Sequence, residues 1–147
     1  MEIVQINIQK AKDLLKEFER YEASLYPAET KYPDSMESLT NQNVVFYGAM
    51  EDELLLGVGA LEGFKGYGEI KGVFIIEAHR GKGLAKSIML ALERHLIDQS
   101  VRYAKLEIGI LQYEALGLYR RLGYKECHAF GTYHPDPLSV FMTKALK

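Results

Sequence analysis

Hydrophobic and polar positions change their spacing twice in the N-terminal third of the chain. Between Glu2 and Ile8, apolar side chains alternate with polar ones, which predicts an opening strand. From Lys10 onward the apolar residues recur every three or four positions, which predicts an amphipathic helix that Pro27 ends. The residues of this apolar stripe are Leu14, Leu15, Phe18, Tyr21 and Leu25.

The segment from Pro27 to Asn43 has neither period and is rich in turn-forming residues. It predicts a loop with one short helix over Ser35–Leu39. Its acidic side chains either face a cationic amine or belong to a solvated loop whose helix is capped by Asp34 or Ser35. These acidic residues are Glu29, Asp34 and Glu37.

Three apolar runs rich in β-branched and aromatic residues then predict a meander of strands. Val44–Met50 and Leu54–Leu61 are separated by a short acidic turn. The third run, Glu69–Ile76, follows the glycine-rich turn Gly63–Gly68.

Helical and strand patterns alternate in the second half of the chain. The spacing predicts, in this order, a helix, a strand, a helix and two strands: Gly83–Ser100, Ala104–Gly109, Tyr113–Leu122, Tyr124–Phe130 and Ser139–Ala145. Gly123 is expected to end the second of these helices, and the loop Gly131–Pro137 joins the last two strands. This order predicts a mixed α/β sheet with helices between strands, in one domain spanning residues 1–147.

Composition and charge limit the binding partners and the cellular location that we expect for the protein. The net charge of −2 gives no reason to expect nucleic acid binding. No run approaches 18 consecutive apolar residues, and Met1–Ile3 lacks the start of a signal peptide, so we expect no membrane span and a cytoplasmic location.

The single cysteine, Cys127, excludes an intrachain disulfide, and within a predicted strand it favours a buried thiol over a nucleophile. The four histidines share no metal-ligand spacing with Cys127, and we expect no metal.

The turn between the third meander strand and the following helix has the composition of an anion site. Gly81 and Gly83 allow a ligand to approach the backbone closely, and the first N–H groups of the helix have no partner within it. These donors and the helix dipole suit a pyrophosphate, and Arg80, Lys82 and Lys86 add positive charge. The spacing fits neither a P-loop nor a dinucleotide fingerprint. The residues alone leave open an ordinary helix start with solvated lysines.

Two motifs resemble the GCN5-related N-acetyltransferase (GNAT) superfamily. Arg80-x-x-Gly83-x-Ala85 is similar to the acyl-CoA loop of that family, R/Q-x-x-G-x-G/A. The second motif resembles N-x-x-A-x-x-L-Y-x-x-L-G-F/Y with glutamine in place of asparagine, and reads Gln112-x-x-Ala115-x-x-Leu118-Tyr119-x-x-Leu122-Gly123-Tyr124. Two such motifs in the right order are far less expected by chance than one, and the order of elements resembles the GNAT fold over nearly the whole chain.

The resemblance implies an α/β (α+β) fold with a mixed, mostly antiparallel sheet of about seven strands and about four helices. The strands holding Glu69 and Glu107 would splay apart, and acetyl-CoA would enter the gap as a cosubstrate. The backbone of Val73–Ile75 would face the pantetheine arm, although an ordinary core strand is an equally good interpretation of that segment. The implied cofactor-binding residues are Val73, Phe74, Ile75, Arg80, Gly81, Lys82, Gly83, Leu84, Ala85, Lys86, Gln112 and Tyr119.

Acyl transfer to an amine needs an uncharged nucleophile, whereas an aliphatic ammonium has a pKa of about 10, so a general base is useful. Two carboxylates stand at positions that resemble catalytic glutamates of the family. Glu69 resembles that of the histone-acetylating branch and Glu107 that of the ribosomal-protein N-terminal branch, and we place Glu69 slightly ahead. For each, the alternative is a strand glutamate that faces solvent or pairs with Lys71 or Lys105.

Tyr119 is the candidate general acid. A phenol with its ordinary pKa of about 10 is protonated at neutral pH and can donate its proton to a departing thiolate. The alternative is a core tyrosine in line with Ala115 and Leu122 on the helix.

The sequence thus predicts an acetyl-CoA-dependent N-acetyltransferase that acts directly on a primary amine of a small molecule or a peptide. The alternative is a non-catalytic acyl-CoA-binding or sensing module. Tyr133, His134 and Asp136 either line the acceptor pocket or form a surface turn. Whether the protein forms a homodimer is left open.

Overall fold

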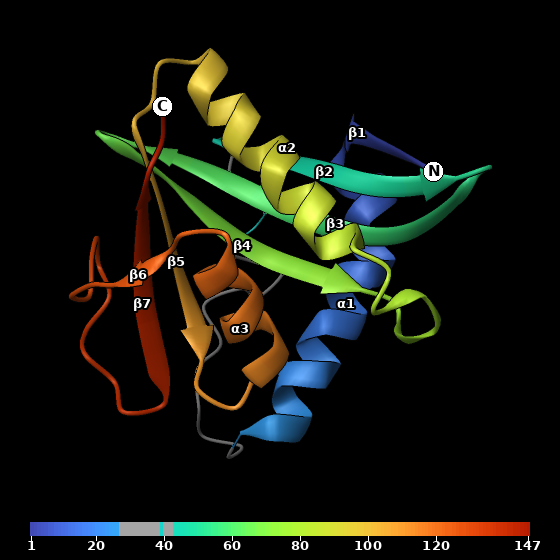
Figure 1. The fold of residues 1–147 in the computed structure, drawn as a ribbon. Coiled ribbons are helices and arrows are strands. Elements are labelled where there is room, and N and C mark those ends of the chain that lie inside the picture. The colour runs from blue at the N-terminus through green and yellow to red at the C-terminus, as the bar shows by residue number, and fades with distance from the viewer. Residues whose placement is uncertain (27–38, 40–42) are drawn as a thin grey trace.

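The computed structural model describes residues 1–26, 39 and 43–147, in which seven strands form one sheet in the order β1-β2-β3-β4-β5-β7-β6 (Figure 1). The strands are β1 (Glu2–Ile6), β2 (Val44–Glu51), β3 (Leu54–Phe64), β4 (Tyr67–Ile75), β5 (Tyr103–Gly109), β6 (Lys125–Glu126) and β7 (Ser139–Ala145). Neighbouring strands are antiparallel except β4 and β5, which are parallel. The expected mixed, mostly antiparallel sheet is confirmed.

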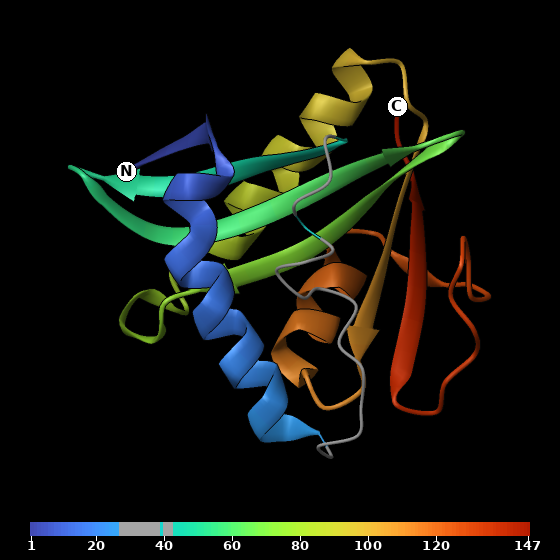
Figure 2. The same ribbon diagram turned by 180° about the vertical axis from the view of Figure 1, so that it is seen from behind.

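Helices cover both faces of this sheet. α1 (Ile8–Leu25) packs on one face, whereas α2 (Leu84–Asp98) and α3 (Tyr113–Arg121) pack on the other (Figures 1 and 2). A single 3₁₀ turn, η2 (Glu77–His79), leads from β4 toward α2.

About four helices were expected, and the described residues form three α-helices. The short helix predicted over Ser35–Leu39 lies outside the described residues except for Leu39, which is fully buried beneath α1. The acidic residues Glu29, Asp34 and Glu37 also lie outside them.

Two hydrophobic cores result from this arrangement. On the α1 side, Leu15 and Phe18 pack against residues such as Phe74 of β4. On the α2 side, Ile88 and Leu92 are completely buried in a core that includes Ile70 and Leu106. Each buried side chain of this size contributes about 1.5–3 kcal/mol. Because both faces of β3 are covered, its sequence is a nearly continuous apolar run rather than an alternating one.

The predicted boundary between the first strand and the first helix was wrong by two residues. β1 ends at Ile6, and the helix begins at Ile8 rather than near Lys10. The side chain of Asn7 accepts a hydrogen bond from the Lys10 N–H at 3.0 Å, so it caps the helix and ends the strand. Similarly, β3 and β4 extend into the predicted glycine-rich turn, which shrinks to the two residues between Phe64 and Tyr67.

The strand predicted over Tyr124–Phe130 was also wrong in length, because β6 covers only Lys125–Glu126. Cys127 follows it with one backbone hydrogen bond to Phe141, and its half-buried thiol has a pKa raised by burial. Phe130 then packs against Tyr67 and Phe141 instead of continuing the strand. Aromatic packing of this segment outweighs its strand propensity.

β4 and β5 separate soon after they meet. Their parallel pairing covers three residue pairs and ends at Ile70 and Leu106. Beyond this point β5 continues beside β7, while β4 runs on toward η2 without β5 at its side. The expected splayed pair of central strands is confirmed, and it creates an opening in the middle of the sheet.

Candidate active site

The turn before α2 presents bare main chain to its surroundings. Gly81 and Gly83 have φ angles of 79° and 83°, a left-handed conformation that favours glycine. A Cβ atom at either position would meet no described atom within 4 Å. Gly83 is also the N-cap of α2 and supplies no side-chain cap, so the first N–H groups of α2 point into this open space. The geometry suits a bound anion.

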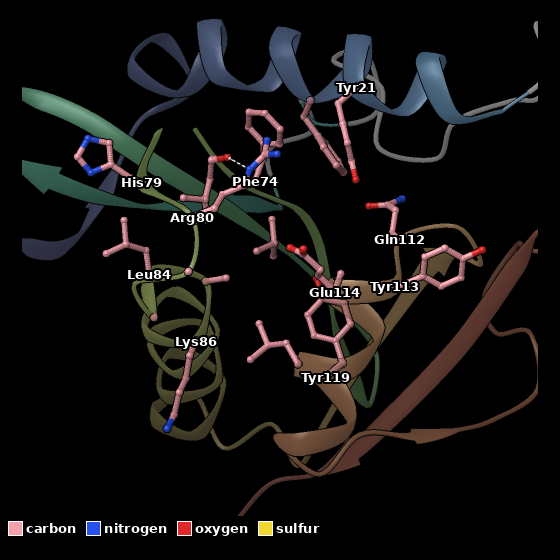
Figure 3. Close-up of a pocket in the computed structure, with 18 of the residues that line it drawn as sticks. Tyr21, Phe74, His79, Arg80, Leu84, Lys86, Gln112, Tyr113, Glu114 and Tyr119 are labelled. Carbon is pink, nitrogen blue, oxygen red and sulfur yellow. Dashed lines mark hydrogen bonds between the residues drawn. The ribbon is translucent and has the colours of Figure 1, made fainter. Parts of the chain in front are cut away.

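A cavity of about 550 Å³ extends from this turn to the opening between β4 and β5 (Figure 3). This volume is typical of a small-molecule site. Most of the residues expected to bind a cofactor line it: Val73, Phe74, Ile75, Arg80, Gly81, Gly83, Leu84, Ala85, Lys86, Gln112 and Tyr119. The sequence motifs therefore describe one continuous surface, although they lie about 30 residues apart.

Of the three expected cations, Lys86 lines the cavity as an exposed side chain, and the other two are placed differently. Lys82 is exposed and does not line the cavity. Arg80 lines it, but its Nε donates a hydrogen bond to the Ile75 carbonyl at 2.8 Å. Its guanidinium also lies 5.5 Å from the ring centre of Tyr21 and 5.2 Å from that of Phe74. Arg80 thus ties the turn to β4 and α1.

Several lining residues were not singled out from the sequence. Phe18 and Tyr21 come from the apolar stripe of α1, whereas Glu114 and Arg121 come from α3. The described lining carries three cations, Arg80, Lys86 and Arg121, and the carboxylate of Glu114. Its net charge is therefore positive. His79, Leu111, Tyr113, Ala115 and Leu118 complete the lining. The helical periodicity contained the signal for Phe18 and Tyr21, but periodicity does not say which helix face meets a cavity.

Tyr119 projects from α3 into the cavity and is 4% exposed (Figure 3). Its ring centre lies 6.0 Å from that of Tyr124. The Tyr124 hydroxyl donates to Glu93 of α2 at 2.7 Å, and Lys144 of β7 donates to the same carboxylate at 2.9 Å. Burial, together with the neighbouring Glu93 carboxylate, raises the pKa of Tyr124 far above its ordinary value. This buried network holds the end of α3 against α2 and β7.

Neither candidate base lines the cavity. The register pairs Glu69 with Lys105, and the period of two places Glu107 on the same sheet face as Lys105. Ile70 and Leu106 point to the opposite face, into the core beneath α2. Glu69 and Glu107 therefore lie on the face away from α2.

Each candidate carboxylate accepts a hydrogen bond from a hydroxyl near the C-terminus of the chain. Tyr133 donates to Glu69 at 2.5 Å, and Ser139 donates to Glu107 at 2.6 Å. Glu69 is 3% exposed, whereas Glu107 is half-buried. Lys71, named above as a pairing alternative for these carboxylates, forms an ion pair with Glu62 at 2.8 Å.

Tyr26, at the end of α1, reaches the mouth of the opening. Its hydroxyl accepts a hydrogen bond from the Leu111 N–H at 3.2 Å, and it lies so close to Gly109 that a Cβ there would overlap it. Burial raises the pKa of Tyr26, and the charges of Glu22 and Glu107 add to this rise. Tyr26 thus brings α1 next to Glu107, and no pattern in the sequence pointed to it.

Among residues 1–26, 39 and 43–147, no group of three His, Cys, Asp or Glu side chains is arranged to hold a metal ion. In the same part of the chain, no helix is both long and apolar enough to cross a membrane.

Comparisons with known proteins agree with this geometry. The model of the acetyltransferase (GNAT) family matches residues 8–124. The IAA acetyltransferase of Azospirillum brasilense is 34% identical over 137 residues, which cover 90% of this chain and 88% of the relative. The crystal structure of a putative acyl-CoA N-acyltransferase from Klebsiella pneumoniae superposes with a TM-score of 0.84 at 31% identity, covering 99% of this chain and 97% of the other.

A third comparison concerns the fold alone. The PaiA N-acetyltransferase of Thermoplasma acidophilum, solved in complex with coenzyme A, superposes with a TM-score of 0.77 at 19% identity and covers 98% of both chains. The matches agree on one fold over nearly the whole chain. The chain belongs to the GNAT family, and it is an N-acetyltransferase.

Proposed function

We propose that this protein transfers an acetyl group from acetyl-CoA directly to a primary amine of a small molecule or a peptide. Residues 1–147 would form a single N-acetyltransferase domain that works in the cytoplasm. The observation that carries the proposal is the cavity, which begins at the uncapped N-terminus of α2 and ends at the opening between β4 and β5.

The residues present fit the donor. The pyrophosphate of acetyl-CoA would lie in the open space around Gly81 and Gly83, where main-chain N–H groups and the helix dipole favour negative charge. The pantetheine arm would follow Val73–Ile75, whose apolar side chains and main chain border the cavity. Gln112 is 6% exposed and lines the cavity beside the Val73–Ile75 strand segment, so its amide would meet a pantetheine amide group there.

The side chains around the opening would handle the protons. Glu69 or Glu107 would take a proton from the acceptor ammonium, directly or through water, and leave the amine free to attack the thioester carbonyl. Main-chain N–H groups of β4 would stabilise the oxyanion that develops. When the C–S bond breaks, Tyr119 would give its proton to the departing thiolate, and the second proton lost by the attacking nitrogen would return through water to the Tyr119 phenolate. The products are then the acetylated amine and free CoA, and the proton taken up by the base goes to solvent.

An assay of thiol release tests this function. The purified protein is mixed with acetyl-CoA and a panel of amines that includes small amines, diamines and peptides with free N-termini. We expect CoA release that depends on at least one amine, with a matching acetylated product by mass spectrometry. Binding of acetyl-CoA without release for any amine would favour the acyl-CoA-binding module instead.

Propionyl-CoA and butyryl-CoA are run in parallel to test the choice of acyl group. The separation between β4 and β5 closes at Ile70 and Leu106, where the strands begin to pair. We therefore expect little room for a longer acyl chain, and turnover should fall as the chain lengthens. Equal rates for the three donors would contradict the acetyl preference while leaving acyl transfer intact.

A further inference from the structure

The loop between β6 and β7 crosses to the middle of the sheet and places a phenol on Glu69. Tyr133 belongs to this loop, and its hydroxyl donates to Glu69 at 2.5 Å from a position 64 residues along the chain. Short hydrogen bonds to a carboxylate are among the strong ones, because the acceptor is charged. This contact joins an irregular segment to a carboxylate of the central strand β4.

The Tyr133 ring is held in place by an aromatic cluster. Its ring centre lies 5.3 Å from that of Phe130 and 5.5 Å from that of Phe141. Phe130 in turn meets Tyr67 edge to face at 5.6 Å. Such pairs add about 0.5–1.5 kcal/mol each beyond their buried area. The hydroxyl therefore reaches Glu69 from a ring whose position is already fixed by packing.

The charges that face Glu69 come from three strands. Glu62 of β3 and Lys105 of β5 are its register partners, and Glu107 follows Lys105 on the same face. Lys71 of β4 is paired with Glu62 at 2.8 Å. The Lys105 amino group lies 5.7 Å from the ring centres of both Tyr67 and Phe130.

Among these charged neighbours, Tyr133 supplies a neutral hydrogen-bond donor to Glu69. Glu62 and Glu107 disfavour a negative charge at Glu69, whereas the cations Lys71 and Lys105 favour it. The phenol of Tyr67 is close enough that the Glu69 charge adds to a rise in its pKa caused mainly by burial. A hydroxyl that donates to the carboxylate adds to the factors that favour its ionised form and also fixes its orientation.

We propose that Tyr133 is a positioning residue for Glu69, which favours the ionised carboxylate and holds it in one orientation for the reaction with the acceptor amine. The inference rests on the proposed function, and it assigns the role of base to Glu69. In this proposal the phenol acts through Glu69.

The test compares Tyr133→Phe with the wild-type protein. This change keeps the ring and its packing and removes only the hydroxyl. Loss of the donor should raise the pH at which Glu69 ionises by about one unit. We therefore expect the acidic limb of the kcat/KM profile to move to higher pH by a similar amount, with kcat at neutral pH about 5- to 20-fold lower and the affinity for acetyl-CoA unchanged.

A second measurement reads Glu69 without relying on turnover. Glutamate labelled with ¹³C at the carboxyl carbon is followed by NMR as the pH is changed, and the Glu69 signal is assigned by its absence in Glu69→Gln. Tyr67→Phe is the matched control, because it removes a phenol from the same aromatic cluster that donates no hydrogen bond to Glu69 in the described residues. We expect the Glu69 titration to move in Tyr133→Phe and to stay within about 0.3 units in Tyr67→Phe.

The outcomes separate the two proposals. A wild-type protein that acetylates no amine contradicts the proposed function, whatever the titration of Glu69 shows. An active wild-type protein whose acidic limb stays in place in Tyr133→Phe overturns the role of Tyr133. The same conclusion follows if Tyr67→Phe moves the limb as far as Tyr133→Phe does, because the effect would then belong to the cluster and not to the hydrogen bond.

Discussion

The two sides of the opening between β4 and β5 are built in different ways. On the α2 side, the turn at Gly81 and Gly83 offers main-chain groups and open space, and side chains contribute little. On the other side, Glu69 and Glu107 depend on hydroxyls of Tyr133 and Ser139, which arrive from a distant part of the chain. The first side is assembled from consecutive residues, whereas the second is assembled by tertiary packing.

This difference indicates what each side tolerates. A site made of main-chain groups tolerates many substitutions at neighbouring positions, but it does not tolerate one that changes the backbone conformation. A site made of paired side chains accepts backbone variation nearby but not the loss of a single oxygen. Four substitutions test this contrast.

Gly83→Val should have the largest effect. A β-branched residue at φ 83° is strained, and its side chain would fill the space assigned to the pyrophosphate. We expect the affinity for coenzyme A, measured by calorimetry, to fall about 100-fold or more, which is roughly 2.7 kcal/mol.

Gly66→Val is the control for backbone strain at Gly83. Gly66 has φ 89° and equally open surroundings, but it lies in the turn between β3 and β4 and does not line the cavity. The two variants should lose similar thermal stability, and Gly66→Val should keep its affinity for coenzyme A. Unchanged binding in Gly83→Val would remove the pyrophosphate assignment.

Glu69→Gln should lower kcat about 100-fold or more while the affinity for acetyl-CoA stays near that of the wild type. The amide keeps the shape of the side chain but cannot take up a proton. Steady-state rates and donor binding are measured for Glu69→Gln and Glu107→Gln side by side. A larger loss of kcat in Glu107→Gln would assign the base to Glu107 and refute the preference for Glu69.

Tyr119→Phe should reduce turnover about 10-fold with little change in donor affinity. The effect is smaller because a thiolate, with a pKa near 8.5, can leave without being protonated first. Tyr124→Phe is the matched variant: it removes the hydrogen bond to Glu93 and should lower the free energy of unfolding by about 1–3 kcal/mol without a comparable loss of turnover. Wild-type turnover in Tyr119→Phe would leave Tyr119 as a packing residue.

Lys86→Ala should have the smallest effect. Lys86 lines the cavity rim and is exposed, so it contributes screened attraction to a phosphate. We expect the dissociation constant of coenzyme A to rise about 3- to 10-fold at low salt and less at high salt. Lys82→Ala, outside the cavity, should change it less than about twofold, and equal effects of the two changes would point to a general field of positive charge.

The same contrast explains what the sequence could predict. The sequence pointed to the turn before α2 and to nearby residues of which most line the cavity, because a few consecutive residues carry both the backbone geometry and the motif. The resemblance also anticipated the separation of β4 and β5. Local patterns suffice where the structure itself is local.

Other features could not be predicted because they depend on which distant residues meet. The sequence singled out Arg80 as a cation of the turn, but it did not show that Nε donates to a carbonyl of β4 or that the guanidinium lies over rings from β4 and α1. Tyr26 contacts Leu111 across 85 residues, and no period or motif marks it. The short length of β6 likewise follows from the packing of Phe130 against Tyr67, which becomes visible only once the sheet is formed.

A sheet that opens in its middle has two interior edges as well as two outer ones. Where β5 leaves β4 after Ile70, the main chain of both strands becomes a template on which a foreign strand could pair. A bound donor would cover that template, so molecules lacking it should be more prone to self-association and to proteolytic attack near Val73–Ile75. Storage with coenzyme A should therefore slow aggregation of the purified protein.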